Sequence, residues 1–203
     1  MKNLKIVSMP KALALLAMVA APTFAGSSAA ADPAVEITPV SPYQIAGDLL
    51  HTPSNIKWEP YGKNKRAKVV ESEGVPGGQA IQIEVKRKPR DPWDIRMKAE
   101  FDQDISSGDN IELYFWLRAE SIQKGKETGK VEAVIGRNVK PHDTVIVHEI
   151  LPTTEWKMYK VSGTAGTEFP SSESDMGFNI GLMKQTIEFG PFYAIKAPAE
   201  TPE

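Results

Sequence analysis

Residues 91–119 read DPWDIRMKAEFDQDISSGDNIELYFWLRA and predict two β-strands separated by a turn that contains Gly108. In residues 95–101 apolar side chains alternate with charged ones, and in residues 111–117 they alternate with polar or aromatic ones. Side chains on a strand point to opposite faces with a period of two, so each strand has one apolar face and one polar face. We interpret the apolar faces as core and the polar faces as surface.

Similar short segments recur along the rest of the chain, with turn residues between them. No sustained helical period of apolar residues appears after residue 25. Many short strands at this spacing are typical of an antiparallel sandwich or barrel, so the fold class predicted is all-β. The remaining predicted strands are residues 65–71, 79–86, 130–136, 144–150, 156–161, 177–182 and 186–195.

The first 25 residues predict an export signal. Three lysines precede the apolar run ALALLAMVAA at residues 12–21, and small residues follow at plausible cleavage positions. The run is shorter than the roughly 20 apolar residues that a membrane-spanning helix needs, and no cysteine follows it to carry a lipid. We therefore expect a secreted or periplasmic bacterial protein without membrane insertion.

The remaining domain boundaries follow from composition. Residues 26–42 are rich in Ala, Ser and Pro and predict a flexible leader, and residues 197–203 (APAETPE) predict a disordered tail. Between them, residues 43–196 are long enough for one domain with a sizeable core. The chain has no cysteine, so packing without disulfides must stabilise that domain.

The charge balance argues against some partners. The whole chain has a net charge of −2, and removal of residues 1–25 leaves 21 basic against 26 acidic residues, a net charge of −5. Nucleic-acid binding depends on neutralising phosphates with Lys and Arg, so an acidic protein is a poor candidate for it. The basic run at Lys63, Lys65, Arg66 and Lys68 is interpreted as a solvated strand edge, where lysines discourage aggregation.

The polar faces of the first two strands mix charged and aromatic side chains, a combination that can stack on a sugar ring and hydrogen-bond its hydroxyls. We predict that Trp93 or Trp116 stacks on the sugar.

An alternative is that these tryptophans lie in the core or plug a sheet end, and that the arginines form ion pairs with Glu100 or Glu112. Two arginines in one cleft would favour an acidic glycan, and Trp156 is predicted to be core. The candidate binding residues are Trp93, Arg96, Glu112, Tyr114, Trp116, Arg118 and Asn179.

Five motifs occur in order along the chain: residues 77–83 (GGQAIQI), 92–97 (PWDIRM), 108–119 (GDNIELYFWLRA), 156–159 (WKMY) and 187–192 (IEFGPF). Together they resemble the jelly-roll carbohydrate-binding modules found beside xylanases and glucanases, and the resemblance covers about residues 65–196. It implies a galactose-binding-like β-sandwich of two antiparallel sheets, with a glycan on the concave face of one sheet.

The same resemblance bears on cofactors. Many members of this group hold a structural calcium through an aspartate in the last strand, but here that strand reads EFGPF. We therefore predict no cofactor, with a structural calcium as the open alternative.

Catalysis has little support in the sequence. A glycosidase needs two carboxylates across a cleft, and carboxylates on strands are common by chance. There is no G-x-S-x-G motif, and His51, His142 and His148 lack metal-ligand spacing. We predict a non-catalytic polysaccharide-binding protein. The alternatives are an envelope module that binds a protein partner and a small glycan-active enzyme.

Overall fold

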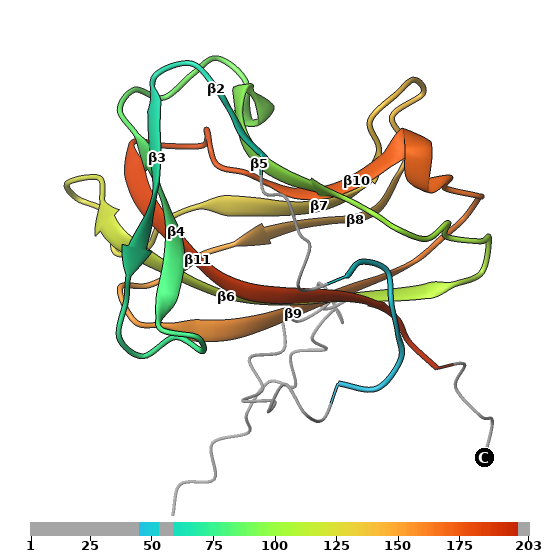
Figure 1. Ribbon diagram of the computed structural model, residues 1–203. Coiled ribbons are helices and arrows are strands. Elements are labelled where there is room, and N and C mark those ends of the chain that lie inside the picture. Colours follow the sequence, from blue (N-terminus) through green and yellow to red (C-terminus); the bar gives the residue numbers. More distant parts are fainter. Residues whose placement is uncertain (1–44, 53–58, 199–203) are drawn as a thin grey trace, which may run out of the picture. The chain divides into compact units, whose positions relative to one another are not determined.

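The computed structural model describes residues 45–52 and 59–198, which form two antiparallel β-sheets packed face to face (Figure 1). Sheet A has the strand order β3-β4-β11-β6-β9, with β1 paired to β11, and sheet B has the order β2-β5-β10-β7-β8. The strands are β1 (Asp48–Leu49), β2 (Glu59–Gly62), β3 (Lys65–Glu71), β4 (Gln79–Val85), β5 (Ile95–Glu100), β6 (Asn110–Ile122), β7 (Val131–Arg137), β8 (Thr144–Ile150), β9 (Lys157–Thr164), β10 (Ser174–Asn179) and β11 (Gln185–Lys196).

The predicted fold class is confirmed, because every segment predicted as a strand overlaps one of these strands. Two strands were missed. β1 has only two residues, and β2 contains Pro60, which lowers the strand signal. Two single-turn 3-10 helices directly precede strands: η3 (Pro92–Asp94) precedes β5, and η4 (Ser171–Glu173) precedes β10.

The two strands predicted in residues 91–119 are present, and they do not pair with each other. They are β5 and β6, and they lie in different sheets, so the segment between them crosses the sandwich. Both apolar faces still meet in the core. Phe115 of β6 contacts Phe178 of β10 with ring centroids 4.9 Å apart, and Phe178 contacts Phe189 of β11 at 5.1 Å. Burial of each such side chain stabilises the fold by roughly 1.5–3 kcal/mol.

The predicted signal (residues 1–25) and leader (residues 26–42) lie outside the described residues, as does most of the predicted tail. These boundaries therefore stay predictions. Within residues 45–52 and 59–198, no helix is both long and apolar enough to cross a membrane.

The first described segment, residues 45–52, is fixed to sheet A through His51. The Ala194 amide donates to His51 Nε2 at 3.1 Å, and the His51 ring lies 4.9 Å from that of Phe192. The amide of Leu50 donates to the Ala194 carbonyl, which completes the attachment. Burial lowers the pKa of His51 to about 4, although the nearby Asp102 carboxylate opposes that effect.

This attachment predicts a pH-dependent stability. The pKa of His51 in the fold lies below its ordinary value of 6.5, so the neutral form stabilises the fold and protonation favours the unfolded chain. That contribution is complete above pH 6.5 and is lost as the pH falls toward 4. Urea unfolding at pH 7 and pH 5 should show a loss of up to about 2 kcal/mol. The variant His51→Asn keeps an acceptor for the Ala194 amide, and it should lose much less over that interval. An equal loss in both proteins would contradict this assignment.

Candidate functional site

The residues predicted to bind a ligand do not share one face. Glu112, Tyr114, Trp116 and Arg118 lie on the outer face of sheet A, on β6. Arg96 and Asn179 lie on the outer face of sheet B, on β5 and β10, and Trp93 lies in η3, directly before β5. The prediction that all seven form a single cleft is therefore wrong. Sequence alternation separates inside from outside, but it does not say which sheet a strand joins.

On sheet A, Arg118 is part of a closed polar network. Its Nε donates to Glu188 at 2.7 Å, and its guanidinium lies 5.1 Å from the centroid of the Trp156 ring. The Glu188 side chain is only 3 % exposed and also accepts from Gln82 at 2.8 Å and from Ser72 at 3.2 Å. The Trp156 indole donates to Ser72 at 3.2 Å, so it lies on the outer face. The prediction that Trp156 belongs to the core is thus wrong.

The rest of the β6 outer face is also occupied by internal contacts. Glu112 accepts from the Tyr114 hydroxyl at 2.6 Å and from Lys160 at 2.8 Å. Tyr114 is buried, and half-buried Trp116 packs against the apolar cluster to which Tyr114 belongs. These side chains stabilise the outer face of sheet A and offer little free surface to a ligand.

On sheet B, the strand register places five side chains in one row across the outer face. Tyr61 of β2 is opposite Arg96, Arg96 is opposite Asn179, Asn179 is opposite Glu132, and Glu132 is opposite Glu149. Adjacent strands are about 4.8 Å apart, so the row is roughly 19 Å long. We call the row Tyr61, Arg96, Asn179, Glu132 and Glu149 the sheet B row.

Arg96 lies along the sheet because Gly177 leaves room for it. A Cβ atom added to Gly177 would lie 2.8 Å from Arg96 Nε. The guanidinium crosses this glycine and forms an ion pair with Asp175, whose side chain is 6 % exposed. Burial raises the pKa of Asp175, and the positive charge of Arg96 opposes that effect. Arg96 therefore presents a flat, neutralised surface next to Tyr61.

Asn179 occupies the centre of the row. Its amide nitrogen donates to Glu132 at 2.6 Å, while its Oδ1 atom is buried and has no hydrogen-bond partner in the described part of the chain. A buried carbonyl oxygen without a donor costs free energy. A hydroxyl that reached this point would supply the missing hydrogen bond.

Two exposed aromatic residues lie on the elements next to β5, namely β2 and η3. Among the described residues, the large hydrophobic side chains that are exposed include two aromatic ones, Tyr61 at 41 % and Trp93 at 55 %. β2 and η3 are in close contact, because a Cβ atom on Gly62 would lie 2.0 Å from the Asp94 carbonyl oxygen. Burial raises the pKa of Tyr61, and the positive charge of Arg96 opposes that effect. The Tyr61 hydroxyl and the Arg96 guanidinium therefore interact electrostatically. Trp93 is among the binding residues predicted from the sequence, and Tyr61 is not.

The structural calcium that the sequence leaves open stays a prediction. Within residues 45–52 and 59–198, no group of three or more His, Asp or Glu side chains could hold a metal ion. Glu188, the carboxylate of the EFGPF segment, already accepts from Arg118, Gln82 and Ser72.

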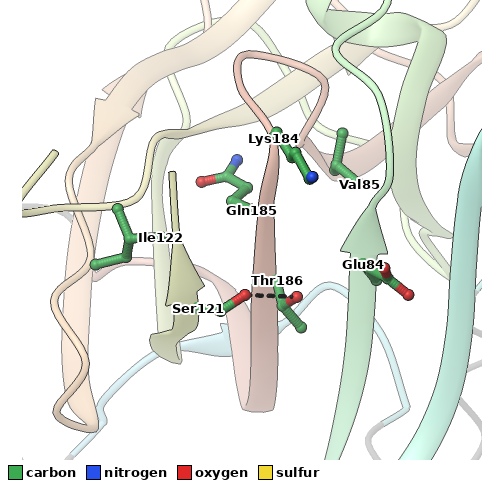
Figure 2. A pocket seen from close by; sticks show the side chains of 7 residues that line it. All are labelled: Glu84, Val85, Ser121, Ile122, Lys184, Gln185 and Thr186. Carbon is green, nitrogen blue, oxygen red and sulfur yellow. Dashed lines mark hydrogen bonds between the residues drawn. The ribbon is translucent and has the colours of Figure 1, made fainter. Parts of the chain in front are cut away.

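Two hollows elsewhere on the molecule are poorer candidates. One, at the ends of β4, β6 and β11, has a volume of about 100 Å³, which is below the roughly 300–1,000 Å³ of typical ligand pockets. Figure 2 shows Ser121 and Thr186 joined by a hydrogen bond of 2.9 Å in this pocket. The other, of about 620 Å³, is lined by the residues of the β3–β4 hairpin. Neither has an aromatic ring on its wall.

Comparison with solved structures identifies the architecture. The second N-terminal cellulose-binding domain of Cellulomonas fimi β-1,4-glucanase C matches with a TM-score of 0.55 at 15 % identity, over 83 % of this chain and 98 % of that domain. The fold is the jelly roll of carbohydrate-binding modules. A CBM4 structure matches with a TM-score of 0.54 at 18 % identity, over 68 % of this chain and 92 % of that one.

One of the matching structures contains more than one module, and this chain matches only part of it. The CBM22-1–GH10 modules of Clostridium thermocellum xylanase 10B, complexed with xylohexaose, match with a TM-score of 0.50 at 11 % identity. The match covers 78 % of this chain but only 29 % of that one. No protein-family model and no curated protein matches the sequence.

Proposed function

We propose that this protein binds a polysaccharide along the outer face of sheet B and has no catalytic role. The observation that carries the proposal is a pair of exposed aromatic residues, Tyr61 at the end of the sheet B row and Trp93 in η3, directly before β5. Aromatic faces stack on the apolar face of a sugar ring, while Arg, Asn and Glu side chains hydrogen-bond its hydroxyls. The fold supports this proposal, because similar solved structures are cellulose-binding domains and modules from a xylanase.

The charges of the row favour a glycan with a neutral backbone. Arg96 is neutralised by Asp175, and Lys130 is neutralised by Glu149 at 2.6 Å. The two arginines expected to favour an acidic glycan, Arg96 and Arg118, lie on different sheets, and each is paired with a carboxylate. The row is therefore suited to hydroxyl groups rather than to carboxylates of the ligand.

The carboxylates of the row are engaged in structural contacts, which supports a binding role rather than catalysis. Glu132 accepts from Asn179, and Glu149 pairs with Lys130. A glycosidase requires one carboxylic acid that is protonated and a second carboxylate that is free to attack or to activate water. The export signal predicted at residues 1–25 adds that the polysaccharide is met outside the cytoplasm.

Affinity electrophoresis in gels that contain hydroxyethylcellulose or a neutral xylan tests this function. The protein is expected to be retarded in at least one of these gels, and Trp93→Ala should remove the retardation. Leu151→Ala is the matched control, because Leu151 is similarly exposed at 52 % but lies outside the row, and it should migrate like the unmodified protein. Absence of retardation in every gel would overturn the proposal and favour a module that binds a protein partner.

A further inference from the structure

A second charged surface lies next to the exposed aromatic pair. Two short segments contain four cationic residues each, the first in residues 63–68 and the second in residues 86–90. The Lys86 amide donates to the Asn64 carbonyl at 3.0 Å, so the two segments touch. Figure 1 shows both segments at the same corner of the molecule, beside η3. We call these eight residues the basic edge: Lys63, Lys65, Arg66, Lys68, Lys86, Arg87, Lys88 and Arg90.

The basic edge is not neutralised from within. The side chains are exposed except for Lys65, which is half-buried. None of them forms an ion pair among the described residues, although seven cations elsewhere in that part of the chain do. The nearest carboxylate in the strand register is Glu84, opposite Arg66, and these two side chains form no ion pair. The positive potential of eight clustered cations is therefore available to an external anion.

Only half of the basic edge can be explained as a solvated strand edge. Lysines on the edge strand β3 discourage pairing with another chain. That argument does not apply to Lys86, Arg87, Lys88 and Arg90, which lie in a loop after β4. Short runs rich in Lys and Arg are typical of surfaces that bind polyanions. The cations of residues 86–90 therefore need a different explanation from those of residues 63–68.

The position of the basic edge indicates what its ligand is. Tyr61 precedes Lys63 by two residues and Trp93 follows Arg90 by three, so the two aromatic residues flank Lys63 and the loop cations in the sequence. Arg66 and Lys68 lie opposite Glu84 and Gln82 in the strand register and face outward from sheet A. A polymer that stacks on these rings extends onto the basic edge at one end of the sheet B row. There it meets cations without ion-pair partners among the described residues, whereas Arg96 of the row is paired with Asp175 and Glu149 of the row is paired with Lys130.

We infer that the basic edge binds carboxylate or sulfate groups of an anionic polysaccharide whose backbone lies on the sheet B row. This inference rests on the proposed function. It adds that the preferred ligand has a sugar backbone suited to the row and anionic substituents suited to the edge. Charged contacts of this kind weaken as salt rises, because screening shortens the Debye length from roughly 30 Å at 0.01 M to roughly 3 Å at 1 M.

The test compares two polymers with the same β-1,4-glucan backbone, neutral hydroxyethylcellulose and anionic carboxymethylcellulose. The unmodified protein should bind carboxymethylcellulose at least tenfold more tightly at about 0.01 M salt, and this preference should vanish at about 1 M salt. The variant Lys86→Gln/Arg87→Gln/Lys88→Gln should lose the preference and keep its affinity for hydroxyethylcellulose. The matched control Lys86→Arg/Arg87→Lys/Lys88→Arg retains the charge and should retain the preference.

Each result separates the inference from the proposed function. Equal binding to both polymers at low salt, or an unchanged preference in the glutamine variant, would overturn the inference and leave the proposed function standing. No binding to hydroxyethylcellulose or to a neutral xylan would count against the proposed function. Capture by phosphatidylglycerol vesicles without binding to carboxymethylcellulose would assign the basic edge to a membrane surface and overturn the inference.

Discussion

Replacement of Arg118 by alanine is expected to lower the free energy of unfolding by about 3 kcal/mol and to leave glycan affinity unchanged. Glu188 is 3 % exposed and has Arg118 as its cationic partner at 2.7 Å. Removal of one member of a buried ion pair leaves an uncompensated charge in the fold, at a cost of roughly 3–5 kcal/mol. We expect the lower end of that range because Arg118 itself is 27 % exposed.

Urea unfolding measures this effect. The control is Lys130→Ala, which breaks the ion pair between Lys130 and Glu149. Both of these side chains are more than one-third exposed, so this variant should change the free energy of unfolding by less than about 1 kcal/mol. The double variant Arg118→Ala/Glu188→Ala should be less destabilised than the sum of its single variants, because it leaves no unpaired charge. An Arg118→Ala protein of normal stability that no longer binds glycan would move the site to sheet A.

The double variant Tyr61→Ala/Trp93→Ala is expected to reduce glycan affinity at least about 100-fold without a comparable loss of stability. Aromatic side chains that anchor a ligand cost about 2 kcal/mol or more when truncated, and 1.4 kcal/mol corresponds to a tenfold change in Kd. Both rings are exposed in the unliganded protein, at 41 % and 55 %, so their removal leaves no large cavity.

Isothermal titration calorimetry with a soluble glucan or xylan hexaose measures this effect. Tyr61→Phe keeps the stacking face and should retain most of the affinity. Trp116→Ala is the opposite control, because Trp116 packs against the outer face of sheet A, so this variant should lose stability and keep its affinity. Unchanged affinity in the double variant would remove the observation on which the proposed function depends.

The inward and outward faces of the strands could be predicted from the sequence, because burial follows the period-two alternation. In β6, Leu113, Phe115 and Leu117 are buried in the core, as the alternation requires. The pairing of strands distant in the chain could not be predicted. The row depends on contacts between β5 and β10, which are separated by β6 to β9 in the sequence.

Individual site residues illustrate the same limit. Arg96 and Arg118 have the same alternating pattern around them, yet one faces outward from sheet B and the other from sheet A. Tyr61 was missed because Pro60 precedes it in a strand of four residues. The alternation of Glu59 and Tyr61 around that proline was the available signal. Trp156 and Tyr159 fall on opposite faces of one strand, and Trp156 was predicted to be the core residue. Instead Tyr159 lies in the core, and the Trp156 indole nitrogen donates to Ser72 on the outer face.

The most direct test of the central claim is a titration of ¹⁵N-labelled protein with a neutral glucan or xylan hexaose, followed by amide chemical shifts. We expect the largest shifts at the sheet B row and η3, with the side-chain amide of Asn179 and the indole of Trp93 among the signals that move. Shifts concentrated on Tyr114, Trp116 and Arg118 instead would place the ligand on sheet A and contradict the account.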